Sequence, residues 1–356
     1  QNRLFWRYKS FACCRRMVKQ IIVFFILLNS VNLWSVNLEA ILSSKPEKKL
    51  SDYELFEDLT NQLPSDGVHP YILHSALFSD YADKERFVYV PEGVKAKFKP
   101  NEVYEFPVGA VLVKTFSYSE TTSMGKKLLE TRLLLNQENG WKAHTYVWNE
   151  EQTDAFLKVA GYTYENIEFL KNGELMQVSY RVPNQNQCKE CHLKNNAIMP
   201  IGPKSRNLNF SIQYKDEEEN QISFWIENGL VENHMPLDLI VNWTDQSATL
   251  NHRARAYLDI NCGHCHLSSG SASNTGLYLN YTETNDMNIG IFKKPVAAGR
   301  ASADLKYSIV PGKPQESILL HRLNSLDPGV MMPESGRALL HSEGVELIND
   351  WIENLQ

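Results

Sequence analysis

Hydrophobic and polar residues alternate over much of the region between residues 87 and 182. In the run LMQVSYRV the apolar side chains occupy every second position, at Met176, Val178, Tyr180 and Val182, as expected for a strand that is buried on one face. Asn139-Gly140 and Asn172-Gly173 each separate two β-favouring runs, and Asn-Gly is a strong signal for a hairpin turn. The pattern therefore predicts a meander of antiparallel strands that ends at Pro183.

The spacing of apolar residues changes to a helical period in the second half of the chain. The segment TLNHRARAYLDIN places four apolar residues on one helical face, namely Leu250, Ala254, Tyr257 and Leu258. NQISFWIENGL is predicted to form a helix that ends near Gly229, and SEGVELINDWIENL a helix with Ser342 as its N-cap. We expect a set of helices joined by long polar connections.

Length and charge narrow the classes of function. A chain of 356 residues is long enough for two domains or for one large domain. Its net charge of −6 gives no sign of the basic surface that neutralises phosphates, so we expect no nucleic-acid partner.

The N-terminal residues predict export. Six basic residues precede the apolar run IIVFFILL (residues 21–28), namely Arg3, Arg7, Lys9, Arg15, Arg16 and Lys19. This order is typical of a signal peptide, predicted over residues 1–40, and a start at Met17 would make it compact. We expect a periplasmic or otherwise exported protein, whose membrane contact is limited to this segment if the segment stays uncleaved as an anchor.

The motif Cys-x-x-Cys-His occurs twice and uses most of the cysteines. Of six cysteines, Cys13 and Cys14 precede the apolar run, and the other four lie in CKECH (residues 188–192) and CGHCH (residues 262–266). Exported proteins usually use their cysteines in disulfides. Because all four later cysteines belong to the motifs, we expect their thiols to serve the chemistry of the motifs.

Three uses of such a motif compete. Zinc needs four ligands close together, and here the two pairs are more than seventy residues apart. Thioredoxin-like redox chemistry needs one Cys-x-x-Cys in a βαβ context, which the helical pattern does not offer. Covalent haem uses every residue of the motif, because the thiols add to the vinyl groups and the histidine binds the iron. The sequence therefore favours haem.

This interpretation predicts two covalently attached haem c groups. The attaching cysteines and iron-binding histidines would be Cys188, Cys191 and His192 for the first group, and Cys262, Cys265 and His266 for the second. His264 occupies an x position of the second motif. We expect its side chain to face solvent or to lie beside a propionate.

The sixth ligand of each iron decides between electron transfer and ligand chemistry. For the second haem, Met332 in a Met-Pro step is the preferred ligand and Met331 the next; the alternative is that both methionines only pack against the haem. For the first haem, Met235 in another Met-Pro step is preferred over His234, and Met199 is too near the motif in sequence.

Several stretches resemble a family of bacterial dihaem c-type cytochromes of unassigned role. ARAYLDINCGHCH, PVAAGR, SIVPGKPQESILLHRL and DPGVMMPESGR are similar to its C-terminal class I cytochrome c domain, and NQCKECH, PIGPKSRNLN and FPVGAVLVKTF are similar to its earlier part. The resemblance covers nearly the whole chain after residue 50 and implies that His266 and Met332 are an axial pair. The β region also resembles the sheet domain of mono-haem cytochromes that oxidise hydroxylamine, but no lysine of this chain is identified as the porphyrin crosslink of those enzymes.

Together these observations predict an α+β fold, with an N-terminal antiparallel β-rich domain followed by helical cytochrome c-like haem domains. The expected boundaries are residues 41–184 for the β-rich domain, 185–245 for the first haem segment and 246–356 for the C-terminal cytochrome c domain. The expected function is electron transfer between redox partner proteins. The alternative is a haem enzyme, peroxidase-like or acting on small nitrogen compounds, with the first haem catalytic and the second an electron relay.

Overall fold

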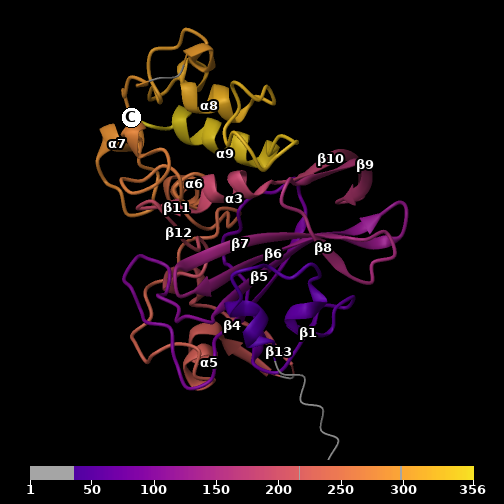
Figure 1. Cartoon of the computed structure of the whole chain (residues 1–356). Coiled ribbons are helices and arrows are strands. Elements are labelled where there is room, and N and C mark those ends of the chain that lie inside the picture. The colour runs from indigo at the N-terminus through magenta and orange to yellow at the C-terminus, as the bar shows by residue number, and fades with distance from the viewer. Residues whose placement is uncertain (1–35, 216, 297–298) are drawn as a thin grey trace, which may run out of the picture. The chain divides into compact units, whose positions relative to one another are not determined.

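Among the described residues, eight strands form one antiparallel sheet (Figure 1). The computed structural model describes residues 36–215, 217–296 and 299–356, so the predicted signal peptide lies mainly outside the described residues. The strands of the sheet are β3 (Val68–Pro70), β4 (Asp83–Tyr89), β5 (Val111–Thr121), β6 (Gly125–Gln137), β7 (Gly140–Trp148), β8 (Ala155–Leu157), β9 (Tyr162–Lys171) and β10 (Glu174–Val182). Their order is β10-β9-β5-β6-β7-β8, with β4 also paired to β5, and β3 to β4.

Both Asn-Gly hairpins are confirmed. Gln137 pairs with Gly140 where β6 turns into β7, and Lys171 pairs with Glu174 where β9 turns into β10. Residues with positive φ sit in both turns, at +90° for Gly140 and at +83° for Gly173. Glycine adopts such angles without a steric penalty, which explains why the local sequence alone predicted the turns.

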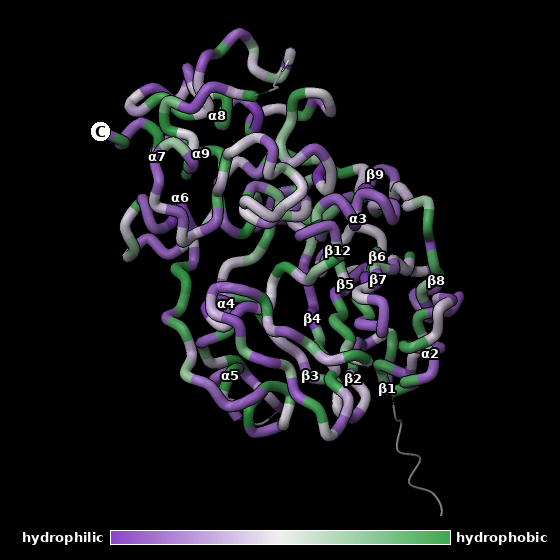
Figure 2. The backbone as a smooth tube through the Cα atoms, turned by 60° about the vertical axis from the view of Figure 1, so that its left-hand side comes forward, coloured by the Kyte–Doolittle hydropathy of each residue, from purple (hydrophilic) through white to green (hydrophobic). Residues whose placement is uncertain are grey.

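Each face of the sheet is covered by a hydrophobic core. Successive side chains of a strand point to opposite sides, so one strand contributes to both cores. Val111 and Val113 belong to one core cluster, with Ile41 of helix α2 (Leu38–Leu42). Leu112, between them, belongs to a second cluster with Trp225 of helix α5 (Gln221–Glu227). Green hydrophobic stretches of the tube are visible near the labels β4, β5 and β6 (Figure 2).

Short helices make up most of the regular structure after β10. They are α3 (Gln185–His192), α4 (Ser205–Leu208), α5, α6 (Leu250–Asn261), α7 (Asp286–Ile289), α8 (Ile318–Leu323) and α9 (Ser342–Glu353). The apolar face predicted for residues 250–261 is present in α6, where Tyr257 and Leu258 pack in a third core with Ile348 and Trp351 of α9. Helix α9 begins at Ser342, but its N-cap position is His341 rather than the predicted Ser342.

The predicted fold class is wrong in its helical part. Within the described residues the regular structure is mostly antiparallel sheet, with eight short α-helices, and 22% of these residues are helical when the 3-10 segments are included. The chain after the β-rich part therefore does not form helical cytochrome c-like domains. Between α6 and α8 it runs through turns and 3-10 segments, in which left-handed residues such as Gly276 and Gly290 close the turns. In these connections the turns provide hydrogen bonds for nearby backbone groups, so the segments do not continue as helix.

Three two-stranded sheets lie outside the main sheet. They are β1 (Phe56–Asp58) with β2 (Leu63–Pro64), β11 (Leu193–Lys194) with β12 (Ala197–Ile198), and β13 (Ser211–Tyr214) with β14 (Glu217–Asn220). The β11–β12 pair directly follows the first motif and shapes its surroundings. In the part of the chain that the structure describes, every helix is too short or too polar to cross a membrane.

Candidate functional site

Helix α3 carries the first motif and begins at a capping box. The Asn184 side chain accepts from the backbone N–H of Gln187, and the Gln187 side chain accepts from the backbone N–H of Asn184. These bonds satisfy N–H groups that the first turn of a helix leaves free. One turn later Cys188 is buried against β7, with its Sγ atom 3.8 Å from the Thr145 hydroxyl. Burial raises the pKa of the Cys188 thiol.

His192 is held so that one ring nitrogen is available to a metal. Its Nδ1 lies 2.7 Å from the backbone carbonyl oxygen of Met199, and because a carbonyl only accepts, Nδ1 carries the proton. The Met199 N–H donates in return to the His192 carbonyl oxygen at 2.8 Å, across the β11–β12 turn. Burial lowers the pKa of His192 to about 4, so the ring is neutral. A histidine whose Nδ1–H is bound to a carbonyl presents Nε2 as a metal ligand.

The second motif follows the C-terminus of α6 in a tight turn. The N–H groups of Cys265 and His266 both donate to the carbonyl oxygen of Cys262, at 3.1 and 2.9 Å. The His266 side chain is buried, and its Nδ1 lies 3.5 Å from the Thr275 hydroxyl. Burial lowers the pKa of His266 to about 4 and raises that of Cys262 to about 12. Both groups are therefore neutral at physiological pH.

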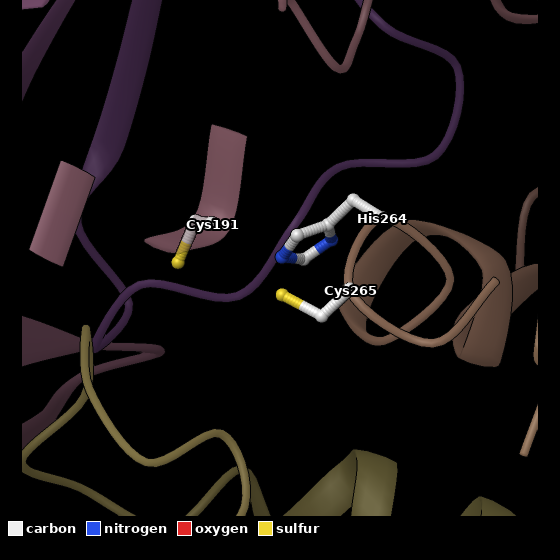
Figure 3. A group of neighbouring side chains, drawn as sticks. All are labelled: Cys191, His264 and Cys265. Carbon is white, nitrogen blue, oxygen red and sulfur yellow. The ribbon is translucent and has the colours of Figure 1, made fainter. Parts of the chain in front are cut away.

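The two motifs meet in space. Cys191, His264 and Cys265 bring their sulfur and nitrogen atoms within 4.8 Å of one another, and Figure 3 shows the three side chains pointing toward a common point. A hydrogen bond from the Cys191 thiol lowers the pKa of Cys265 to about 7, and the same bond, with burial, raises that of Cys191 to about 12. The four motif cysteines form no disulfide among the described residues.

His264, which was expected to face solvent or to lie beside a propionate, is half-buried. Its Nδ1 atom is buried and has no hydrogen-bond partner within residues 36–215, 217–296 and 299–356. A buried polar atom without a partner is costly. The histidine at this x position therefore belongs to the site, and the local motif gave no reason to expect it.

A buried ion pair joins helix α4 to helix α6, the helix that leads into the second motif. Arg206 of α4 donates to both carboxylate oxygens of Asp259, at 3.0 and 3.1 Å, and Asp259 lies three residues before Cys262. The side chains are 6% and 3% exposed. Burial alone would raise the pKa of Asp259, but the cations Lys204 and Arg206 outweigh it and lower the pKa. Sequence reasoning missed this pair, because its members lie on separate helices.

Residues of both motifs line a cavity of about 610 Å3, including Cys191, His192 and His264. Ligand pockets commonly measure about 300–1,000 Å3. Arg206, also in the lining, has a buried Nε atom that lacks a hydrogen-bond partner among the described residues. A neutral histidine with a free Nε2, unpaired thiols and a cavity of this size fit the attachment of a haem.

The methionines proposed as sixth ligands differ in their surroundings. The N–H of Met332 donates at 3.0 Å to the carbonyl oxygen of Arg322, whose side-chain charge helps to depress the pKa of His266. Met331 is buried at 3% exposure.

Of the residues considered for the first iron, only Met199 lies beside the first motif. Met235 is 87% exposed, and it is not among the residues that line the described cavities. Both ring nitrogens of His234 have partners, the Tyr104 hydroxyl and the Glu232 carbonyl oxygen. Met199 lines the larger cavity, and its carbonyl oxygen accepts from His192.

Comparison of the chain with protein-family models, curated proteins and solved structures finds no match.

Proposed function

We propose that the protein is a dihaem electron-transfer protein, which attaches one haem through Cys188 and Cys191 and another through Cys262 and Cys265. The observation that carries the proposal is the meeting of two Cys-x-x-Cys-His motifs that are far apart in sequence, with Cys191 and Cys265 in one cluster. Bound haem would supply a one-electron iron couple. Sites held this close suit a protein that receives an electron from one redox partner and passes it to another.

The histidines of the motifs are the residues that would hold the iron. The Met199 carbonyl fixes the ring orientation and tautomer of His192, and burial lowers the pKa of His192 and of His266, which keeps both rings unprotonated at physiological pH. Neutral imidazole is the form that ligates metals. Since attachment of haem through such motifs is expected outside the cytoplasm, the proposal includes export of the chain.

Haem content tests the proposal directly. The full chain, expressed with a periplasmic haem-attachment system, should give a pyridine haemochrome spectrum of two haem c per chain. The double variants Cys188→Ala/Cys191→Ala and Cys262→Ala/Cys265→Ala should each retain one. A colourless full-length protein from cells that mature a control cytochrome would refute the proposal.

The sixth ligand is tested by a matched pair of methionine variants. Met332→Ala should convert one low-spin haem to a form that binds cyanide, whereas Met331→Ala should leave the low-spin spectrum unchanged. An unchanged spectrum in Met332→Ala would exclude this methionine as a ligand. Cyanide binding by the unsubstituted protein would instead favour an enzyme with an open first iron.

A metal ion bound by Cys191, His264 and Cys265 is a second candidate, because these ligand atoms lie within 4.8 Å of one another. Cysteine thiolates and imidazole are the preferred ligands of zinc, and three protein ligands leave a fourth position open. The large sequence separation of the motifs argued against a shared zinc site, but the fold removes that objection. The two candidates exclude each other, since thioether formation consumes both thiolates.

His264→Ala separates the two candidates. A zinc site would lose its metal in this variant, as measured by elemental analysis of the purified protein. Haem attachment does not use His264, so a haem protein should keep both groups. Loss of zinc together with absence of haem would replace the haem proposal with the metal proposal.

A further inference from the structure

Three cationic side chains form a row across the sheet beside the first motif. In the register of the strands, Arg86 of β4 pairs with Lys114 of β5, Lys114 with Arg132 of β6, and Arg132 with Thr145 of β7. Because directly opposite residues on neighbouring strands project to the same face, the four side chains are neighbours. Thr145 is also the residue whose hydroxyl lies 3.8 Å from the Sγ atom of Cys188.

Arg86, Lys114 and Arg132, which form the cationic row, line a cavity of about 140 Å3 together with Thr145. Cys188, Cys191 and His192 belong to the same lining. The cavity is smaller than the about 300–1,000 Å3 typical of sites for drug-sized ligands. Any occupant is therefore small.

The charge of the row is only partly compensated. Arg132 donates to both oxygens of Glu130, at 2.8 and 2.5 Å, and the fully buried Glu130 also accepts from the Tyr180 hydroxyl at 2.7 Å. Arg86 donates to the Lys84 carbonyl oxygen at 3.2 Å. Within the described ranges, neither Arg86 nor Lys114 forms an ion pair with a carboxylate.

This arrangement is unfavourable without a negative group. Like charges directly opposite one another destabilise a sheet, and burial of an unpaired charge costs more. Burial, with the charges of Arg86 and Arg132, holds the pKa of Lys114 well below its ordinary range. Burial likewise lowers the pKa of the nearby Lys84 to about 7, with Arg86 adding to the effect.

We infer that Arg86, Lys114 and Arg132 bind a small inorganic oxyanion in the cavity beside Cys188 and His192. Guanidinium groups bind planar and tetrahedral oxyanions through paired N–H donors, and the lysine adds a compact charge. The Thr145 hydroxyl closes the row as a neutral donor. The inference does not require haem, because the row belongs to the sheet and is present in the polypeptide itself.

Anion-dependent stability of the full-length protein tests the inference. At low ionic strength, nitrite, sulfate and phosphate are each added and compared with chloride at equal ionic strength. A ligand that binds only the folded state raises Tm as its concentration exceeds Kd. At least one oxyanion should raise Tm by several degrees above the chloride reference, and calorimetric titration should show one site per chain.

Lys114→Met and Lys126→Met form a matched pair of variants. Lys126 lies on β6 of the same sheet, but Glu85 already compensates its charge at 3.0 Å. Lys114→Met should reduce oxyanion affinity at least tenfold, because it removes one of the three basic groups of the row. Lys126→Met should leave the oxyanion response intact. If Lys114→Met does not fold, Arg86→Gln supplies the same test.

Three results would overturn the inference. Equal effects of chloride and oxyanions would show general screening of charge. An undiminished oxyanion response in Lys114→Met and Arg86→Gln would place the anion elsewhere. Oxyanion binding only in Cys188→Ala/Cys191→Ala would show that a propionate of an attached haem, rather than a free anion, is the partner of the row.

Discussion

Removing the charge of Asp259 is expected to weaken both the fold and the placement of the second motif. Asp259→Asn keeps the shape of the side chain but leaves the buried Arg206 without its paired carboxylate and removes the negative charge near Lys204. Breaking a buried ion pair by removing one partner costs about 3–5 kcal/mol. The side chains of Arg206 and Asp259 are 6% and 3% exposed, so solvent cannot replace the lost interaction. We expect a loss of this size in the free energy of unfolding.

Urea unfolding followed by tryptophan fluorescence measures the effect, and the chain offers a matched control. Asp327 also pairs with Arg300 through both carboxylate oxygens, at 2.9 and 2.8 Å, but these side chains are 45% and 67% exposed. Asp327→Asn should therefore cost only about 0–1 kcal/mol. Replacing both partners, as Arg206→Met/Asp259→Leu, should recover part of the loss, because apolar side chains leave no buried charge. A cost below about 1 kcal/mol for Asp259→Asn would refute the reasoning.

Three further predictions concern the rest of the described chain. Burial lowers the pKa of His341 from 6.5 to about 4, so on acidification the unfolded chain binds a proton at a higher pH than the folded protein does. The free energy of unfolding should therefore fall by up to about 3 kcal/mol as pH drops from 6.5 to 4. Urea unfolding of His341→Gln should show a smaller loss of stability over the same pH range. Asn184→Ala removes the cap of α3 and should cost about 1 kcal/mol in the same assay. Gly161→Ala would place a Cβ atom 2.6 Å from the Val182 carbonyl oxygen, whereas the Cβ atom of Gly173→Ala would meet no atom within 4 Å, and both glycines have a positive φ, of +77° and +83°. Thermal unfolding should therefore show a larger decrease in Tm for Gly161→Ala than for Gly173→Ala. Equal decreases would contradict the role of this contact.

Local sequence was sufficient where a few neighbouring residues decide the backbone. The two Asn-Gly hairpins form as predicted, because turn geometry depends on the residues in the turn itself. Apolar periodicity also located α6 and α9. The same periodicity overestimated the helical content of the second half, since it cannot show that the connections between helices are turns rather than further helix.

The candidate site, too, could be predicted from the sequence only in part. Spacing alone identified the four thiols and the two histidines of the motifs, because the chemistry of Cys-x-x-Cys-His is local. It expected His264 to face solvent or to lie beside a propionate, and it was silent on Arg206 and Asp259. Lys114 stands within the apolar run VLVKTF, a local signal of a buried charge that lies outside both motifs.

By itself, the sequence determined the hairpin turns, the principal amphipathic helices and which residues are chemically equipped to bind a metal or haem. Only the tertiary structure decided that Cys191 meets His264 and Cys265, and that Arg86, Lys114 and Arg132 stand side by side. Turn and helix signals depend on residues a few positions apart, whereas these groups come from different strands and helices. Their proximity follows from strand register and from contacts between segments distant in sequence, such as the hydrogen bond from the Asn195 N–H to the Ser269 carbonyl oxygen, which no local pattern specifies.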